Sequence, residues 1–426
     1  MGKNTDRKID NAILVGVVLP GMRREQEEES LDELALLADT AGLVVADRLI
    51  QERRGIDPAT FIGKGKVNEV ARRAETANAG RILFDEDLSP VQLKNLEKQT
   101  GRRILDRSML ILEIFAGRAR SREAKTQVAL AQSEYMLPRL TRQWTHLERQ
   151  EGAAGPRRGP GETQLETDKR ALRKKIDTLK KELKQIELQR DVRRKGRQEF
   201  KKVALVGYTN AGKSSLMNAL ADADMFVEDR LFATLDASIR AFRLTGAKKA
   251  LLIDTVGFIR KLPHHLVASF RSTLEEAKEA DLLIHVADIS RPNVEERLGV
   301  VHEVLHDLGI DDKPSLIAFN KVDALEDRRR IPDLRRNHPD AVFVSALKGM
   351  GLEAMRDAVS SKIAGEEVEG CLRLPVDRTR EIAEVYALTT VLELTYEEGV
   401  AVIRYRADPV SAQRLHKLLS NGIAPP

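Results

Sequence analysis

The sequence predicts an α/β protein of four parts, and three observations support this prediction. Strand-like and helix-like segments alternate over residues 10–100 and again over 201–364, a helical apolar repeat follows residues 172–186, and short strand-like runs lie near the C-terminal end. We expect an N-terminal α/β domain (1–117), a helical coiled-coil hairpin (118–198), a second α/β domain (199–364) and a small C-terminal α+β domain (365–426). The length of 426 residues suits several folding units, since one domain usually takes about 100–200 residues.

The composition excludes several classes of protein. Hydrophobic residues make up 42% and charged residues 32% of the chain, and this balance excludes global disorder. No apolar run approaches the roughly 18 residues of a membrane-spanning helix, and residues 1–11 are charged where a signal peptide is apolar. We therefore expect a cytoplasmic protein without a membrane span. Cys371 is the only cysteine, so an intramolecular disulfide and a cysteine-rich zinc site are both excluded.

Positive charge is concentrated in one segment. Residues 139–202 contain 20 Lys and Arg against 10 Asp and Glu, whereas the whole chain has a formal net charge of +5. A basic segment on an otherwise acidic protein is expected for a protein that binds a phosphate-rich partner such as RNA. A solvated helix face is the alternative interpretation of the same charges.

The N-terminal segment is predicted to form a small domain with a largely parallel sheet. Apolar runs at 13–19, 43–50 and 81–84 alternate with amphipathic stretches at 31–41 and 67–77. The sequence Gly63-Lys64-Gly65-Lys66 stands ahead of a predicted helix. It could hold an anion, but a plain turn is the favoured interpretation.

The basic segment has the pattern of a helical hairpin. A helical pattern covers residues 120–138, where Pro138 is expected to end or kink the helix, and the Gly- and Pro-rich residues 151–161 are not expected to form a regular helix. Beyond them an apolar seam recurs at alternating spacings of four and three: Leu172, Ile176, Leu179, Leu183 and Ile186. Two helices packed along this seam would carry Arg157 and Arg158 at the tip, whereas a flexible interdomain linker is the alternative.

A phosphate-binding motif follows the first strand of the second α/β domain. The apolar run 203–206 leads into G-x-x-x-x-G-K-S and an amphipathic stretch. In this motif backbone N–H groups surround the phosphates, Lys213 reaches the β- and γ-phosphates, and the Ser214 hydroxyl binds Mg²⁺. The predicted nucleotide-binding residues of this loop are Gly207, Tyr208, Thr209, Asn210, Ala211, Gly212, Lys213, Ser214 and Ser215.

Three further strand ends complete a predicted guanine nucleotide site. Asp254, at the end of one strand, can hold Mg²⁺ through water, and Gly257 can offer its N–H to the γ-phosphate. Asp323 can accept both the N1–H and the exocyclic amine of guanine, a donor pair that adenine lacks, while Lys321 covers the ring. The predicted site therefore also contains Asp254, Thr255, Val256, Gly257, Asn320, Lys321, Val322, Asp323, Ser345, Ala346 and Leu347.

The sequence also contains the pattern H-E-x-x-H, at residues 302–306. Two histidines four residues apart on a helix can bind zinc, with Glu303 as the base. However, this pattern lies between Asp254 and Asn320, on a helix whose apolar residues would face the sheet of the nucleotide-binding domain. We expect His302 and His306 to face solvent rather than to form a protease site.

The C-terminal unit carries no recognisable chemistry. Residues 388–394 and 400–405 are predicted strands joined by a turn at 397–399, and a helix is predicted from Pro409.

Together these motifs make the chain similar to the HflX family of ribosome-associated GTPases, whose G domain is related to those of translation factors. The resemblance covers residues 14–364. It includes N-terminal motifs at 61–66, 84–90 and 118–140, and a distinctive motif at 158–166. The resemblance implies a GTPase that binds GTP and GDP, uses Mg²⁺, and acts as a monomer on the large ribosomal subunit to split or rescue stalled or idle ribosomes. Whether ATP also binds is left open.

Some site residues are assigned by this resemblance alone. It implies that Thr234 is a Mg²⁺ ligand in the GTP state, although the family's usual Pro-Thr is replaced by Ala237-Ser238 here. It implies rRNA contacts for Arg157, Arg158, Gly159 and Gly161, and a K⁺ ion as a second candidate cofactor at Asn210. Phe258 stands where many GTPases have a glutamine that orients the attacking water, so we assign no catalytic residue and expect slow hydrolysis without the ribosome.

Two other functions are compatible with the sequence. One is a GTPase that acts on another RNA, through tRNA modification or RNA remodelling. The other is a protein-binding regulator whose coiled-coil seam meets another coiled coil. GTP-dependent binding to large ribosomal subunits distinguishes the first interpretation from both.

Overall fold

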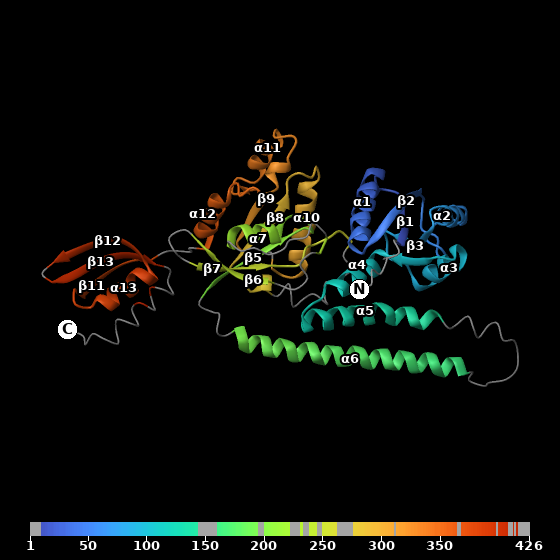
Figure 1. Cartoon of the computed structure of the whole chain (residues 1–426), viewed down its shortest axis with the longest axis horizontal. Helices are drawn as coiled ribbons and strands as arrows, with labels where there is room; N and C mark the ends of the chain where they lie inside the picture. The colour runs from blue at the N-terminus through green and yellow to red at the C-terminus, as the bar shows by residue number, and fades with distance from the viewer. Residues whose placement is uncertain are drawn as a thin grey trace, which may run out of the picture.

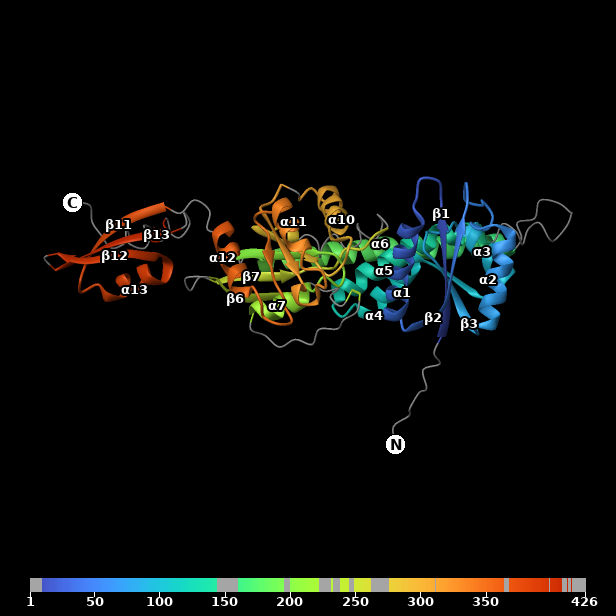
Figure 2. The same cartoon turned by 90° about the horizontal axis from the view of Figure 1, so that it is seen from above.

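The computed structural model describes residues 10–143, 160–194, 200–221, 231–232, 238–244, 249–261, 276–310, 312–363, 368–397, 399–407, 412 and 415. Its parts lie along one long axis, with the N-terminal and second α/β domains next to each other, the long helical pair alongside them, and the C-terminal unit at the far end (Figure 1). A view from above shows the same row (Figure 2). The predicted fold class is confirmed.

The N-terminal domain is a four-stranded parallel sheet covered by helices. The sheet has the strand order β2-β1-β3-β4. Its elements are β1 (Asp10–Val18), α1 (Arg24–Thr40), β2 (Leu43–Glu52), α2 (Lys64–Thr76), β3 (Ala79–Phe84), α3 (Pro90–Thr100), β4 (Arg103–Asp106) and α4 (Arg107–Arg118). Lys64, Gly65 and Lys66 form the first turn of α2. The structure therefore starts this helix three residues before the amphipathic stretch at 67–77, and only Gly63 of the predicted turn precedes it.

Polar side chains fix where two of these helices begin. The Ser89 hydroxyl accepts the N–H of Gln92 at the start of α3, and the Asp106 carboxylate accepts the N–H of Met109 at the start of α4. Asp106 is the last residue of β4, and Ser89 follows the end of β3 by five residues. The carboxyl edge of this sheet also carries Asp85 and Glu86, directly after β3.

Two long helices form the predicted hairpin. Helices α5 (Arg122–Gln143) and α6 (Pro160–Arg194) pack against each other. Ile176 of the predicted seam is buried, and Leu172, Leu179, Leu183 and Ile186 are half-buried. Ion pairs join Arg122 to Glu182 at 2.7 Å and Lys180 to Glu134 at 2.9 Å. Because these pairs are exposed, the apolar seam contributes most of the packing.

The hairpin is anchored to the N-terminal domain through a buried carboxylate. The Tyr135 hydroxyl of α5 donates to Asp106 at 2.6 Å, and the Arg139 guanidinium donates to the same carboxylate at 2.9 Å. Asp106 is only 1% exposed, so these two partners, together with the N–H groups of Leu88 and Met109, stabilise its charge in place of water.

The structure corrects two details of the predicted hairpin. Of the two effects expected of Pro138, the end of the helix is excluded, because α5 continues through it to Gln143. Pro160 and Gly161, which we placed in an irregular segment, lie in the first turn of α6. Proline is tolerated there because the first N–H groups of a helix have no partner within it. Residues 151–159 lie outside the described part of the chain.

The second α/β domain has a six-stranded sheet in the order β10-β9-β8-β5-β7-β6, in which β6 alone is antiparallel to its neighbour. Helices α7 and α12 cover one face, and α10 lies on the other. The elements are β5 (Lys201–Gly207), α7 (Lys213–Ala221), β6 (Ser238–Arg243), β7 (Lys249–Asp254), β8 (Leu282–Asp288), α10 (Val294–Asp307), β9 (Ser315–Asn320), η3 (Val322–Ala324), α11 (Arg330–Asn337), β10 (Val342–Phe343) and α12 (Leu352–Ile363).

A histidine in β8 should make this protein sensitive to acid. Burial, reinforced by repulsion from His302, lowers the pKa of the His285 imidazole to about 3. In the unfolded chain a histidine titrates near 6.5, so below that pH the unfolded state binds a proton that the folded state does not. We expect this side chain to cost about 1 kcal/mol of unfolding free energy between pH 6.5 and 5.5.

Urea titrations at both pH values measure this cost. His285→Gln should lose less stability on acidification than the wild type by that amount, whereas the exposed His306→Gln should behave like the wild type. Equal losses in all three proteins would contradict the assignment.

The C-terminal unit is a three-stranded antiparallel sheet, in the order β11-β13-β12, with one helix. Its elements are β11 (Val368–Pro375), α13 (Thr379–Leu388), β12 (Thr390–Glu397) and β13 (Val400–Ala407). The sequence analysis missed β11 and α13, and it wrongly assigned Leu388 to a strand. Most of the helix predicted from Pro409 lies outside the described residues. The boundaries of the four predicted domains stay predictions.

Within the described residues, none of the helices is both long and apolar enough to cross a membrane.

Candidate nucleotide-binding site

The phosphate loop, residues 207–214, connects β5 to α7 and requires glycine at both of its ends. Gly207 has φ +151°, and a Cβ there would lie 2.2 Å from the carbonyl oxygen of Val286. Gly212 has φ +88°, and a Cβ there would lie 2.2 Å from Nδ2 of Asn320. The backbone can therefore pass closely between neighbouring strand ends, as a loop that surrounds phosphates must.

Lys213 is placed inside this loop. Its ammonium donates to the carbonyl oxygens of Gly207 at 3.1 Å and Tyr208 at 3.0 Å, and the residue is only 6% exposed. Burial lowers the pKa of Lys213 to about 8. A bound phosphate would bring the negative charge that this buried cation lacks.

Ser214 and Asp254 come together as the motif spacing predicts. The Ser214 hydroxyl donates to a carboxylate oxygen of Asp254 at 2.6 Å. A hydroxyl oxygen that can bind Mg²⁺ directly and a carboxylate that can hold one of its water ligands suit this ion, which prefers oxygen ligands and usually keeps several waters. These two residues therefore fit the ion. Thr234, the third expected ligand, lies outside the described residues.

The segment after β7 lies directly on the phosphate loop. The Phe258 N–H donates to the Gly207 carbonyl at 3.1 Å, and the Thr209 N–H donates to the Phe258 carbonyl at 2.7 Å. Gly257 is enclosed, since a Cβ there would lie 2.7 Å from Cα of Thr209 and 3.0 Å from Nζ of Lys213. The Phe258 side chain is 2% exposed and packs in the apolar core, so it does not face an attacking water.

Asn320 joins the base-binding loops to the phosphate loop. Its side-chain N–H donates to the Ala211 carbonyl at 2.9 Å, and its side-chain oxygen accepts the Ala346 N–H at 3.1 Å. The sequence analysis placed Asn320 in the site but did not predict that its side chain links these two loops. Ser345 is buried beside it, whereas Leu347 is 80% exposed.

Asp323 is exposed in η3, where a guanine base can reach it. Its neighbour Lys321 pairs with Asp288 at 3.0 Å. Asp288 ends β8 beside the predicted residues, but no motif in the sequence pointed to it. Sequence reasoning therefore missed the carboxylate that pairs with Lys321.

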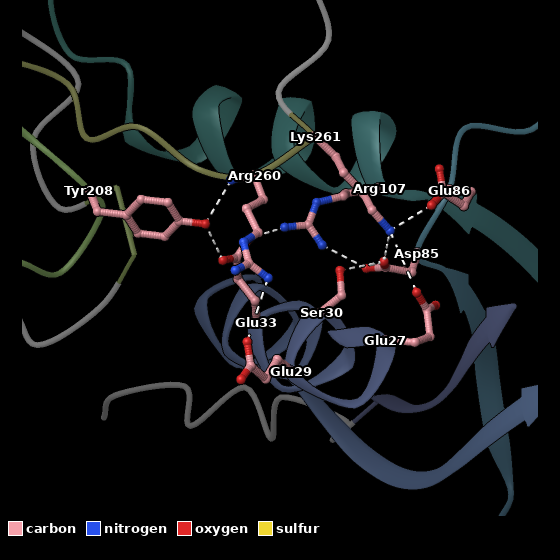
Figure 3. Close-up of polar contacts among 10 residues, drawn as sticks. All are labelled: Glu27, Glu29, Ser30, Glu33, Asp85, Glu86, Arg107, Tyr208, Arg260 and Lys261. Carbon is pink, nitrogen blue, oxygen red and sulfur yellow. Dashed lines mark hydrogen bonds and ion pairs between the residues drawn. The ribbon is translucent and has the colours of Figure 1, made fainter. Parts of the chain in front are cut away.

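Two other predicted loop residues border the N-terminal domain. The Tyr208 side chain points away from the phosphate loop, and its hydroxyl donates to Glu33 of α1, as Figure 3 shows. The backbone of Tyr208 stays its predicted contact with the nucleotide. Asn210 has φ +60° and lines a cavity of about 170 Å³ between the two α/β domains.

The H-E-x-x-H pattern at residues 302–306 lies on α10, as expected. Val301 and Leu305 are buried against the sheet, whereas His302, Glu303 and His306 are exposed. The histidines therefore face away from the core and from the nucleotide site.

The strand order, the phosphate loop and the polar residues at the carboxyl ends of β5, β7 and β9 define a P-loop GTP-binding domain. The chain matches family models described as "GTP-binding GTPase N-terminal" over residues 28–116, "GTP-binding GTPase Middle Region" over 118–197 and "50S ribosome-binding GTPase" over 202–321. These three matches follow one another along the chain.

Curated relatives identify the family. The GTPase HflX of Caldanaerobacter subterraneus is 43% identical over 93% of this chain and 91% of its own length. The GTPase HflX of Escherichia coli is 40% identical over 96% of each chain. A crystal structure of a GTP-binding protein from Sulfolobus solfataricus in complex with GDP, 27% identical, covers 83% of this chain and 99% of that chain with a TM-score of 0.45. On the two sequence matches, the chain belongs to the HflX family of GTPases.

The family and the GTPase activity expected from the sequence are thereby confirmed. The assignment of individual residues to nucleotide, metal and RNA stays a prediction.

Proposed function

We propose that this protein is a cytoplasmic GTP-driven switch that binds the large ribosomal subunit and splits or rescues stalled or idle ribosomes. The observation that carries this proposal is the basic face of the hairpin. Helix α6 contains 11 Lys and Arg against 7 Asp and Glu. Six of these cations are exposed and form no ion pair with the residues that the structure describes: Arg170, Arg173, Lys174, Lys175, Lys181 and Lys184. An exposed basic helix suits the phosphates of rRNA.

The nucleotide site would drive the switch. Lys213 and the phosphate loop would hold the phosphates, Ser214, Thr234 and Asp254 would hold Mg²⁺, and Asp323 would select guanine. Mg²⁺ supplies charge neutralisation at the phosphates when it is bound. Because GTP and GDP differ in the γ-phosphate, the segments that reach it would differ in order between the two states. K⁺ at Asn210 is part of the same proposal.

Two observations support the ribosome over the other candidate partners. The family model over residues 202–321 is described as a 50S ribosome-binding GTPase. In addition, the apolar seam of α6 is already used by α5, so it is not available to another coiled coil. Another RNA, such as tRNA, would bind the same basic face. The experiment below distinguishes binding to the ribosomal subunit from binding to such an RNA.

We expect GTP-dependent sedimentation of this protein with isolated large ribosomal subunits. An excess of tRNA added as a competitor should not remove the protein from the subunits. Replacing Arg157 and Arg158 by alanine should weaken subunit binding at least about tenfold and lower the salt dependence of binding by about two phosphate contacts. The affinity for GDP should not change, because these residues lie far along the chain from the nucleotide motifs.

A matched control uses another adjacent arginine pair. Arg328→Ala with Arg329→Ala removes the same charge from the exposed segment before α11 and should leave subunit binding intact. If the Arg157 and Arg158 variant sediments like the wild type, the tip contact is wrong. If the wild type does not sediment with the subunit in either nucleotide, the ribosome proposal fails.

A further inference from the structure

An acidic site lies at the carboxyl edge of the N-terminal sheet. Glu27 comes from α1, and Asp85 and Glu86 follow β3. One oxygen from each carboxylate lies within 4.8 Å of the others, and Glu27 and Asp85 are 0% and 1% exposed. In open parallel sheets this edge is where ligands bind. Burying carboxylates together is unfavourable without a cation, and burial raises the pKa of Glu27.

The cation in this site comes from the other domain. The Lys261 ammonium lies 2.5 Å from Asp85, 2.6 Å from Glu86 and 3.8 Å from Glu27 (Figure 3). Lys261 lies only four residues after Gly257, whose N–H is expected at the γ-phosphate. A residue close in sequence to the γ-phosphate segment therefore fills a binding site of the N-terminal domain.

The same segment is also attached to the phosphate loop. Phe258 exchanges backbone hydrogen bonds with Gly207 and Thr209. The Arg260 N–H donates at 2.8 Å to the Tyr208 hydroxyl, which in turn donates to Glu33 of α1. Figure 3 shows Tyr208, Arg260 and Lys261 approaching the row of acidic residues on α1 and the end of β3. Residues 258–261 are thus held at one end by the phosphate loop and at the other by the N-terminal domain.

The held segment lies close to Lys213. The Lys213 ammonium is bonded to carbonyl oxygens of its own loop, and a Cβ on Gly257 would lie 3.0 Å from its Nζ atom. A γ-phosphate must contact both Lys213 and the Gly257 N–H, so its entry has to move the segment that Phe258 and Lys261 hold in place.

We propose that Lys261 is a positioning residue for nucleotide discrimination: its insertion between Glu27, Asp85 and Glu86 holds the γ-phosphate segment in the position that GTP must displace. Triphosphate binding then withdraws Lys261 from the acidic site, and the N-terminal domain is released from that segment. Because linkage is reciprocal, whatever weakens the Lys261 contact must favour the triphosphate over the diphosphate.

The test compares affinities for GDP and for a non-hydrolysable GTP analogue by fluorescence titration of the full chain. Lys261→Met should raise the ratio of analogue to GDP affinity about tenfold, within the usual range of coupling between sites. Glu86→Gln, at the half-exposed mouth of the site, should raise it by a smaller factor and serves if the first variant folds poorly. Lys201→Met, which loses only an exposed pair with Asp281, should leave the ratio unchanged.

A charge exchange separates positioning from mere loss of structure. Lys261→Glu should raise the ratio at least as much as Lys261→Met, and adding Glu86→Lys should return it toward the wild-type value by restoring an opposite pair. An unchanged ratio in Lys261→Met and Glu86→Gln would overturn the proposal. So would equal changes in both affinities, or a charge-exchanged protein that behaves like Lys261→Glu alone.

Discussion

Replacing Asp323 by asparagine is expected to weaken GTP and GDP binding by at least about a hundredfold, the largest single effect on nucleotide affinity that this site predicts. The carboxylate is exposed in η3, and we predict that it accepts two hydrogen bonds, from N1–H and from the exocyclic amine of guanine. Asparagine supplies one donor and one acceptor, so the amine would face another N–H group. Leaving a buried donor without an acceptor costs more free energy than a typical hydrogen bond contributes when it is formed.

The same change should improve binding of xanthine nucleotides. Xanthine has a carbonyl where guanine has the amine, and this carbonyl can accept the asparagine N–H. Titration with fluorescent GDP and XDP measures both affinities, and Asp323→Asn should reverse their order. Asp327→Asn, in the same loop but paired with Arg329 on the surface, is the matched control and should bind GDP normally. Unchanged GDP affinity in Asp323→Asn would show that the base lies elsewhere.

Much of the candidate site was predictable because its residues act through local sequence patterns. The phosphate loop needs glycine at fixed positions for steric reasons, and Ser214 follows Lys213 on the first turn of a helix. Asp254 and Asn320 end apolar strands that are recognisable one at a time, and parallel strands bring such ends to one edge. None of these inferences required knowing how two domains pack.

The features that escaped prediction depend on packing between distant parts of the chain. The Tyr208 hydroxyl and Glu33 are 175 residues apart, and Lys261 and Asp85 are 176 apart, so no spacing rule connects them. β11 escaped for a different reason. Its inward positions are Gly370, Leu372 and Leu374, so the apolar alternation by which strands are recognised covers only two side chains.

Arg107→Met is expected to destabilise the N-terminal domain by about 3–5 kcal/mol, the largest effect on stability that the structure predicts. Arg107 begins α4 directly behind β4 and is only 1% exposed. Its guanidinium pairs with Asp85 at 2.6 Å and also with Glu33. Methionine fills a similar volume without charge, so two buried carboxylates would lose their shared cation.

Thermal unfolding followed by circular dichroism measures this loss, which should lower the midpoint by roughly 13–22 °C for a domain of this size. Arg103→Met is the control, because Arg103 pairs with Glu113 at the surface and such pairs contribute at most about 1 kcal/mol. If desolvated charge is the cause, adding Glu33→Gln and Asp85→Asn to Arg107→Met should recover part of the loss. A midpoint that falls further would instead mean that the volume of the arginine matters more than its charge.

Arg107→Met also tests how the acidic site of the N-terminal domain is coupled to nucleotide binding. Glu33 accepts from Tyr208 of the phosphate loop, and Asp85 accepts from Lys261, so the guanidinium connects the two carboxylates that the nucleotide-binding domain contacts. With Arg107 replaced, Lys261 would be the remaining cation beside Asp85 and should be held more tightly. The ratio of GTP-analogue to GDP affinity should then fall, opposite to the change expected for Lys261→Met. A rise in that ratio would mean that Arg107 orders the acidic site rather than competing with Lys261 for it.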